Sequence, residues 1–449
     1  MNLPANLLSE SGLDVYPNSV RTLADGRRLF VARRGKRKVV VTLYNGTLQV
    51  EPLTWGYYQQ LRKMLPLTPV CCEHNLSFGT GDRLGMVTAA HLSALKEFDV
   101  FPVIAQQSPR ELRKTGRTFQ DVLLDAVMGL LESGFTGNFG ADADHVKDEE
   151  SLVDALNAGY SMYTVDISGW LSHSSCLNET SKRIVSRYAG KPFFSVRGSQ
   201  FTPTEEGLLR AAFFYQSALE KLKQMNNLVS ERMHSFDLEI SVDEGANETS
   251  LEDHVYIAEY LHSCGIEFTS LAPKFPGRFE KGIDYQGDVN KLRNSFSSHA
   301  RLCRMLGGYR LSLHSGSDKF SIYPMFHHET EGCLHIKTSG TTWLQAIGII
   351  AKKDEPLFRV LYTLCLANLD ESKEAYDISI ETEQFPAEPP ADIRSFLDRP
   401  DVRQLFHISY GALLREFGDE IRCVLREHED EHYSAVQENI KQHLAVLTA

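Results

Sequence analysis

Carboxylate and imidazole side chains gather at the ends of short apolar segments in this sequence. Asp144 and His145 stand side by side at the end of one segment, and His314 lies near the end of a second, YRLSLHS. A third segment, FDLEISVDEG, alternates between acidic or polar residues and apolar ones. Two histidines and at least one inward carboxylate from three strand ends form the ligand set of a catalytic Zn, Mn, Co or Ni site with open positions. The sequence therefore predicts a divalent metal centre.

The segment FDLEISVDEG is expected to supply the carboxylate of this centre. The residues that share its polar face are Asp237, Glu239, Ser241 and Asp243, and Glu244 follows at the end. Because side chains alternate along a strand and the apolar set must pack against outer helices, the acidic set points into the interior of a barrel. Most of the sixteen histidines are expected to have ordinary surface or hydrogen-bonding roles. His74 and His335 lie nearer the starts of their strands, where a structural role is expected.

Cations gather in the second half of the chain although the formal net charge is −12. Those that follow the last three predicted strands are Lys274, Arg278, Lys281, Lys319 and Lys337. Such a concentration around one rim predicts binding of a carboxylate or a phosphate. Asp82 and Arg83, in the glycine-rich segment GTGDRLG, complete the expected substrate contacts, although a tight turn alone would explain the glycines.

The elements that position these residues follow a repeated pattern of short apolar runs and longer helical segments, which is typical of βα units. The eight predicted strands span residues 69–78, 100–106, 136–141, 161–168, 236–242, 266–273, 309–315 and 334–339. This pattern predicts an α/β protein with a (β/α)8 TIM barrel, whose active site lies at the C-terminal ends of its strands. An open doubly wound sheet is the rival, disfavoured because no strand leads into a GxGxxG turn.

The barrel is expected to carry additions at both ends. Residues 1–68 predict a small β-rich extension, because RRLFVARRGKRKVVVTLYNG alternates between turn signals. The catalytic barrel is expected over 69–350, with an insertion around 169–203. Residues 351–449 are expected to form a helical, charged C-terminal region.

Charge and cysteine content limit the classes of partner and the cellular compartment that we expect for this protein. A net charge of −12 disfavours nucleic acid and anionic membranes as partners. The eight cysteines form no CxxC pair, which indicates a reduced, intracellular protein. No signal pattern opens the chain, and no apolar run approaches the ~20 residues of a membrane span. We expect a cytoplasmic protein that binds a small acidic molecule, and leave homo-oligomerisation open.

Long blocks of the sequence resemble the tagaturonate epimerase family of bacterial hexuronate catabolism, which is related to class II aldolases. These blocks are FGTGDRLG, GADADHVK, EISVDE, LAPKFPGRFEKGIDYQGD, LHSGSDKFSIYP and HIKTSGTTWLQA. The resemblance implies that Asp144 is an acid/base residue beside the ligand His145, and that His314 is a second ligand. The further histidine ligand of the aldolases has no clear counterpart, so Glu239, Glu244 and His335 remain candidates, with Glu239 first.

The resemblance also implies a reaction. Tagaturonate and fructuronate differ at the carbinol carbon β to the ketone, whose C–H is not acidified by the carbonyl. Removal of the carbinol hydroxyl proton by Asp144 or Glu244 would cleave the C–C bond in a metal-assisted retro-aldol step. Re-formation of the bond on the other face of the aldehyde would give the epimer.

Three other functions fit the residues. A class II-type aldolase acting on a ketose or ketose phosphate would release two fragments. A metal-dependent aldose–ketose isomerase would move the carbonyl without inverting the distal centre. A non-catalytic sugar-binding module would bind the sugar and leave it unchanged.

Overall fold

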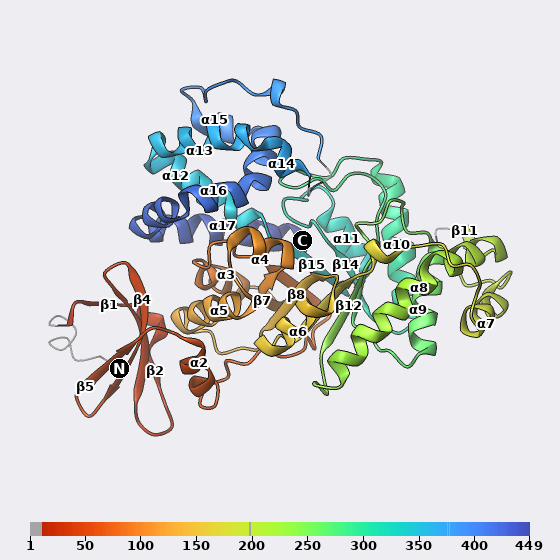
Figure 1. Cartoon of the computed structure of the whole chain (residues 1–449), viewed down its shortest axis with the longest axis horizontal. Helices are drawn as coiled ribbons and strands as arrows, with labels where there is room; N and C mark the ends of the chain where they lie inside the picture. Colours follow the sequence, from red (N-terminus) through yellow and green to blue (C-terminus); the bar gives the residue numbers. More distant parts are fainter. Residues whose placement is uncertain (1–10, 197–198, 375, 377) are drawn as a thin grey trace.

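The computed structural model describes residues 11–449 apart from 197, 198, 375 and 377. The chain begins with a small antiparallel sheet that lies to one side of the main body (Figure 1). Its strands are β1 (Leu13–Val15), β2 (Arg21–Thr22), β3 (Arg28–Arg34), β4 (Arg37–Tyr44) and β5 (Thr47–Glu51). The order is β1-β3-β4-β5, with β2 also paired to β3. Helix α2 (Trp55–Leu61) then leads to the main body. A β-rich N-terminal region is confirmed, and residues 1–10 of the predicted extension lie outside the described part.

Eight parallel strands close into a barrel, which confirms the predicted fold class. They are β6 (Leu76–Thr80), β7 (Phe101–Gln107), β8 (Gly140–Val146), β9 (Met162–Asp166), β12 (Asp237–Ser241), β13 (Ser270–Ala272), β14 (Arg310–Leu313) and β15 (Leu334–Thr338). Strand β15 pairs with β6 and completes the ring. The first and third strands begin later than the sequence predicts, so the segment GADADHV lies within β8 and not after it.

Helices cross between these strands and cover the outside of the barrel (Figure 1). They include α3 (Thr88–Leu95), α4 (Pro109–Thr115), α5 (Phe119–Ser133), α6 (Glu149–Ala158), α9 (Leu251–Ser263), α10 (Val289–Met305) and α11 (Tyr323–Thr330). Ser108 and Glu111 form a capping box at the start of α4. This cap fixes the turn after β7, which brings the first residues of α4 to the mouth of the barrel.

An excursion separates β9 from β12. It contains η2 (Ser168–Trp170), α7 (Glu179–Tyr188), the hairpin of β10 (Phe194–Val196) and β11 (Ser199–Phe201), and the long helix α8 (Glu205–Ser230). An insertion was expected around 169–203, and its residues 197 and 198 lie outside the described part. Helix α8 packs against α9, so it serves as the outer helix of this repeat.

The chain ends in a layer of helices with its own apolar core. These are α12 (Thr341–Lys353), α13 (Glu355–Ala367), α14 (Leu369–Lys373), α15 (Ile393–Leu397), α16 (Pro400–Glu427) and α17 (Glu429–Leu447), with the short turn η3 (Thr382–Gln384). Helix α16 contacts α4 and α17 contacts α3, so this layer lies against the first barrel repeats (Figure 1). Among the described residues, no helix is long and apolar enough to cross a membrane.

Candidate metal centre and active site

A bulge in β8 brings two neighbouring side chains into the same site. Simple alternation along a strand would send Asp144 and His145 to opposite faces. The register of β8 against β9 shifts between Ala143 and Val146, and His145 has a φ of 51°. Bulges of this kind re-aim a side chain. Asp144 and His145 therefore both reach the site, where Oδ1 of Asp144 lies 2.7 Å from Nδ1 of His145.

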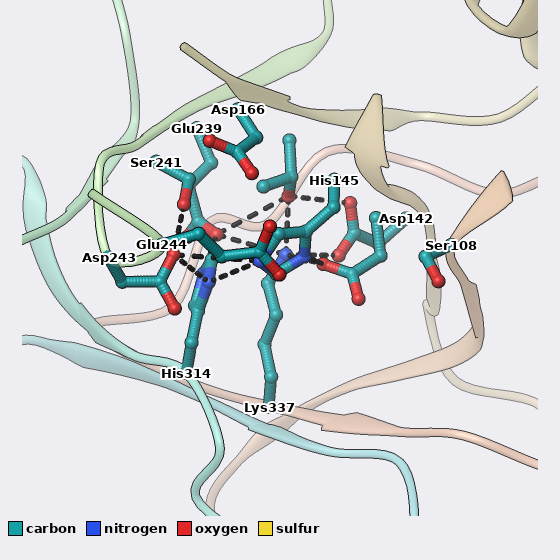
Figure 2. Close-up of polar contacts among 12 residues, drawn as sticks. Ser108, Asp142, His145, Asp166, Glu239, Ser241, Asp243, Glu244, His314 and Lys337 are labelled. Atoms are coloured by element: carbon teal, nitrogen blue, oxygen red, sulfur yellow. Dashed lines mark hydrogen bonds and ion pairs between the residues drawn. The ribbon is translucent and has the colours of Figure 1, made fainter. Parts of the chain in front are cut away.

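Three potential ligand atoms converge at the mouth of the barrel (Figure 2). Nε2 of His145 lies 3.3 Å from Nδ1 of His314 and 3.5 Å from Oδ1 of Asp243. Nδ1 of His314 lies 3.1 Å from the same oxygen of Asp243. Ligands about 2.0–2.1 Å from a tetrahedral zinc ion are separated from one another by about 3.3 Å. The spacing of the three atoms therefore fits a single small divalent cation.

The second nitrogen of each imidazole is held by a carboxylate. Asp144 contacts Nδ1 of His145, and Oε1 of Glu239 lies 2.6 Å from Nε2 of His314. Metal-binding histidines commonly use their outer nitrogen in this way, which fixes the tautomer and the ring orientation. Glu239, the ligand favoured by the sequence, thus lies behind His314, and Asp243 takes the place next to both imidazoles.

Lys337 lies inside the barrel and not at its rim as the sequence predicted. Its ammonium lies 2.7 Å from both Asp142 and Asp144 and 3.0 Å from Glu239, and it also donates to Thr164 (Figure 2). Burial alone would lower the pKa of Lys337, but these carboxylates outweigh it and hold that pKa well above its usual value. The charge of Lys337 is therefore already neutralised, and these contacts favour a structural role over the expected contact with substrate.

Negative charge exceeds positive charge in this cluster. Burial, together with Asp144 and Glu239, raises the pKa of Asp142 to about 6 although Lys337 opposes the shift. Burial would lower the pKa of His145, but Asp144 and Asp243 outweigh it and raise that pKa well above its usual value. A site that favours a proton on Asp142 and on the imidazole of His145 also favours a metal cation, which supplies the same positive charge.

Glu244 lies beside this centre at the rim. Its carboxylate lies 2.6 Å from the ammonium of Lys147 and 3.5 Å from the guanidinium of Arg110. His145, Asp166 and Glu244 form a second group with metal-ligand spacing. However, Lys147 lies between Asp166 and Glu244, at 2.9 Å and 2.6 Å, so a cation already occupies that position. The first group is the better metal site.

A cavity of about 570 Å³ opens above the three ligand atoms. Asp144, His145, Asp243, Glu244 and His314 lie on its wall. The predicted contacts Arg83, Lys274 and Arg278 also line it. The predicted rim cation Lys281 lines it as well. The structure thus brings together most of the residues that the sequence proposed for chemistry, and it adds Arg110 and Tyr376.

Two predicted substrate contacts and one candidate ligand have other roles. The carboxylate of Asp82 accepts hydrogen bonds from the backbone N–H groups of Leu84, Gly85 and Val87, so it stabilises the turn after β6. The buried ammonium of Lys319 donates to three backbone carbonyls, those of Glu280, Ile283 and Ser317. Neither side chain lines the cavity. His335 is buried beside Ser77 on β6, and burial lowers its pKa to about 3. These contacts favour structural roles for all three side chains.

Sequence reasoning missed Asp243 as a candidate ligand and Arg110 as a cavity residue. Asp243 lies two residues beyond the end of β12, and its place on the polar face was visible in the alternation. Arg110 directly follows Ser108 and Pro109 at the start of α4. Its place just after a strand that ends at the active face was a usable signal.

The chain is similar to a family of proteins that share one enzymatic activity. The family model described as tagaturonate epimerase matches residues 27–447. A tagaturonate/fructuronate epimerase of Thermotoga maritima is 40% identical over 404 residues, which cover 86% of this chain and 84% of that protein. The native crystal structure of a fructuronate-tagaturonate epimerase from Cohnella laeviribosi superposes with a TM-score of 0.92 and 29% identity, covering 99% of this chain and 98% of that one. A glycerol complex of the same enzyme gives a TM-score of 0.89 and 28% identity, at the same coverage of both chains.

Proposed function

The chain belongs to the tagaturonate epimerase family and interconverts tagaturonate and fructuronate, and we propose that it does so with a divalent metal ion bound by His145, His314 and Asp243. The observation that carries this proposal is the mutual spacing of 3.1–3.5 Å among the three ligand atoms. The carboxylates behind both imidazoles support it, because they leave the two inward nitrogens free to bind a metal. Zn, Mn, Co and Ni all suit a ligand set of two imidazoles and a carboxylate.

The reaction must invert a carbinol carbon whose C–H is not acidified. A bound divalent cation would polarise the ketone and hydroxyl oxygens of the substrate. We propose that Glu244 accepts the proton of the hydroxyl on the inverted carbon, and that the bond between this carbon and its neighbour on the ketone side then breaks. The resulting aldehyde turns its other face, the bond re-forms, and Glu244 returns the proton. Atoms and electrons balance without a further reactant.

The surroundings of the two acids favour Glu244 over Asp144 as the group that moves the proton. Oδ1 of Asp144 contacts both the imidazole of His145 and the ammonium of Lys337, so that carboxylate is committed to orienting the ligand. Glu244 lines the same cavity with its side chain one-third exposed, and it is positioned by Lys147 and Arg110. Asp144 is therefore a positioning residue in this proposal.

The place of the reaction is also a proposal. All eight cysteines are free in the structure, which fits a reducing compartment. We place the enzyme in the cytoplasm, acting on a small acidic sugar.

The test is nuclear magnetic resonance of purified enzyme incubated with tagaturonate. Protein stripped by a chelator is expected to form no fructuronate, and addition of Zn, Mn, Co or Ni is expected to restore the reaction. Circular dichroism of the stripped protein controls for unfolding. Full activity in metal-free protein would refute the proposed need for a metal ion. Accumulation of two free fragments would indicate an aldolase in place of an epimerase.

A further inference from the structure

Among the described residues, five lysine and arginine side chains line the cavity above the metal centre, and they differ in their partners. The five are Arg83, Arg110, Lys274, Arg278 and Lys281. Arg83 is buried in an ion pair with Glu111 and stacks 3.8 Å above the ring of Tyr410. Lys274 donates to the carbonyl of Gly245, and Arg278 is two-thirds exposed beside Glu280.

Lys281 differs from these three. Its ammonium lies 2.5 Å from Oγ of Ser315, the residue that follows the ligand His314. Within the described part of the chain, no carboxylate lies within ion-pair distance of it. A lysine in a polar cavity without an ionic partner has two N–H groups left for a ligand. Lys281 therefore presents positive charge close to the metal centre.

Arg110 directs a second positive charge into the same cavity. It is the second residue of α4. Its guanidinium lies 3.5 Å from the carboxylate of Glu244 and 5.0 Å from the ring centroid of Tyr376, which comes from the C-terminal region. Burial lowers the pKa of Lys281, and the charge of Arg110 lowers it further. The two cations are thus near enough to repel each other, and an anion bound between them would relieve this repulsion.

The two substrates carry one permanent charge, their carboxylate. We propose that Lys281 and Arg110 together bind this carboxylate and select uronates over neutral ketohexoses. This inference rests on the proposed function, because it assumes that the reacting part of the sugar lies at His145, His314 and Asp243. An arginine can bind a carboxylate through two parallel hydrogen bonds, and a lysine adds a point charge. The pair thus also fixes the direction in which the sugar enters the cavity.

The experiment compares Lys281→Met and Arg110→Met with the wild-type holoenzyme. Loss of one charge-assisted hydrogen bond, about 1.5–3 kcal/mol, corresponds to a rise in KM for tagaturonate of roughly 10- to 150-fold. For Lys281→Met the expected kcat changes less than KM, since the carboxylate is not at the reacting carbon. Arg110→Met is expected to lower kcat as well, because Arg110 also lies 3.5 Å from Glu244. Lys281→Arg is expected to retain most of the affinity, and the surface variant Lys182→Met, whose side chain is 59% exposed, is expected to match wild type.

Metal content and circular dichroism are measured on the same samples. If Lys281→Met fails to fold, Lys281→Gln, which can still hydrogen-bond Ser315, serves as the second variant. A KM within twofold of wild type in folded, metal-loaded Lys281 and Arg110 variants would overturn the inference and leave the proposed function intact. Absence of metal from active wild-type enzyme would instead refute the proposed function. A rise in KM with unchanged metal content supports the carboxylate site.

Discussion

Nε2 of His145 and Nδ1 of His314 face each other at 3.3 Å across the mouth of the barrel, and a carboxylate holds the outer nitrogen of each ring. The two ring centroids lie 4.7 Å apart with a tilt of 55°. Two imidazole nitrogens in such proximity need a shared proton or a shared cation between them. Asp243 beside both nitrogens favours the cation, because it adds a third ligand and a negative charge.

Glu239→Gln tests the outer contact of His314. The amide can still meet Nε2, but it removes the negative charge that makes the imidazole a better ligand. The expected result is a loss of metal affinity of about 10- to 100-fold, measured by competition with a chelating dye. Glu179→Gln, at a side chain that is 89% exposed, is the matched control. Equal metal affinities in the two variants would show that Glu239 does not strengthen metal binding by His314.

Glu244→Gln tests the proposed proton acceptor. Loss of a general base typically lowers the rate by 10²–10⁴-fold. We expect kcat for tagaturonate to fall within this range while the metal content stays that of wild type. Asp144→Asn is expected to lower metal content as well as rate, because Asp144 orients His145. Wild-type activity in Glu244→Gln would show that a residue other than Glu244 accepts the proton.

The fate of the hydrogen on the inverted carbon tests bond cleavage. A retro-aldol step keeps this C–H bond intact, so fructuronate formed in D2O is expected to carry no deuterium there. Mass spectrometry and proton nuclear magnetic resonance of the product measure it. Deuterium at the inverted carbon would mean that the C–H bond itself breaks, and the C–C cleavage proposal would fail.

Buried histidines remote from the metal centre are expected to lower the stability of the fold in acid. Burial lowers the pKa of His91, His299 and His432 to about 4, against 6.5 in an unfolded chain. Between these values the unfolded chain binds more protons than the folded one. The stability that these neutral rings contribute is therefore present above pH 6.5 and is lost as the pH falls toward 4, by up to ~1.4 kcal/mol per pH unit for each ring.

A single variant isolates this effect. Neither ring nitrogen of His91 has a hydrogen-bond partner within the described part of the chain. His91→Leu is therefore expected to lose less free energy of unfolding than wild type between pH 7 and pH 5, as measured by urea denaturation. His328→Leu, at a side chain that is 84% exposed, is the control. Identical pH dependence in wild type and His91→Leu would contradict the assignment.

Most of the strand pattern could be predicted from sequence because most barrel strands contain or adjoin a short apolar run. Strand β8, GADADHV, is the exception, and its start was placed too early. The inward face of FDLEISVDEG was predictable for the same reason, since alternation is a local property. The bulge at Ala143–Val146 was not, because it depends on how β8 pairs with β9. Without it, the joint approach of Asp144 and His145 to one site could be inferred only from resemblance.

Tertiary packing decides which of the predicted lysines face the cavity and which are held by neighbouring groups. Lys319 and Lys337 follow strands as Lys281 does, and nothing local distinguishes them. The structure places backbone carbonyls around Lys319 and carboxylates around Lys337, whereas the hydrogen-bond partner of Lys281 among the described residues is a serine hydroxyl. The replacement of Glu239 by Asp243 as the proposed third ligand has a similar origin, because it depends on which side of His314 each acid reaches.

Anomalous X-ray scattering from crystals of the enzyme soaked in Zn2+ or Co2+ tests the metal centre most directly. We predict one strong peak at the metal's absorption edge, within bonding distance of Nε2 of His145, Nδ1 of His314 and the carboxylate of Asp243. The peak should vanish in His314→Gln crystals and persist in His328→Gln crystals. A fully active enzyme with no peak at these three residues, or with its only peak elsewhere, would contradict the account.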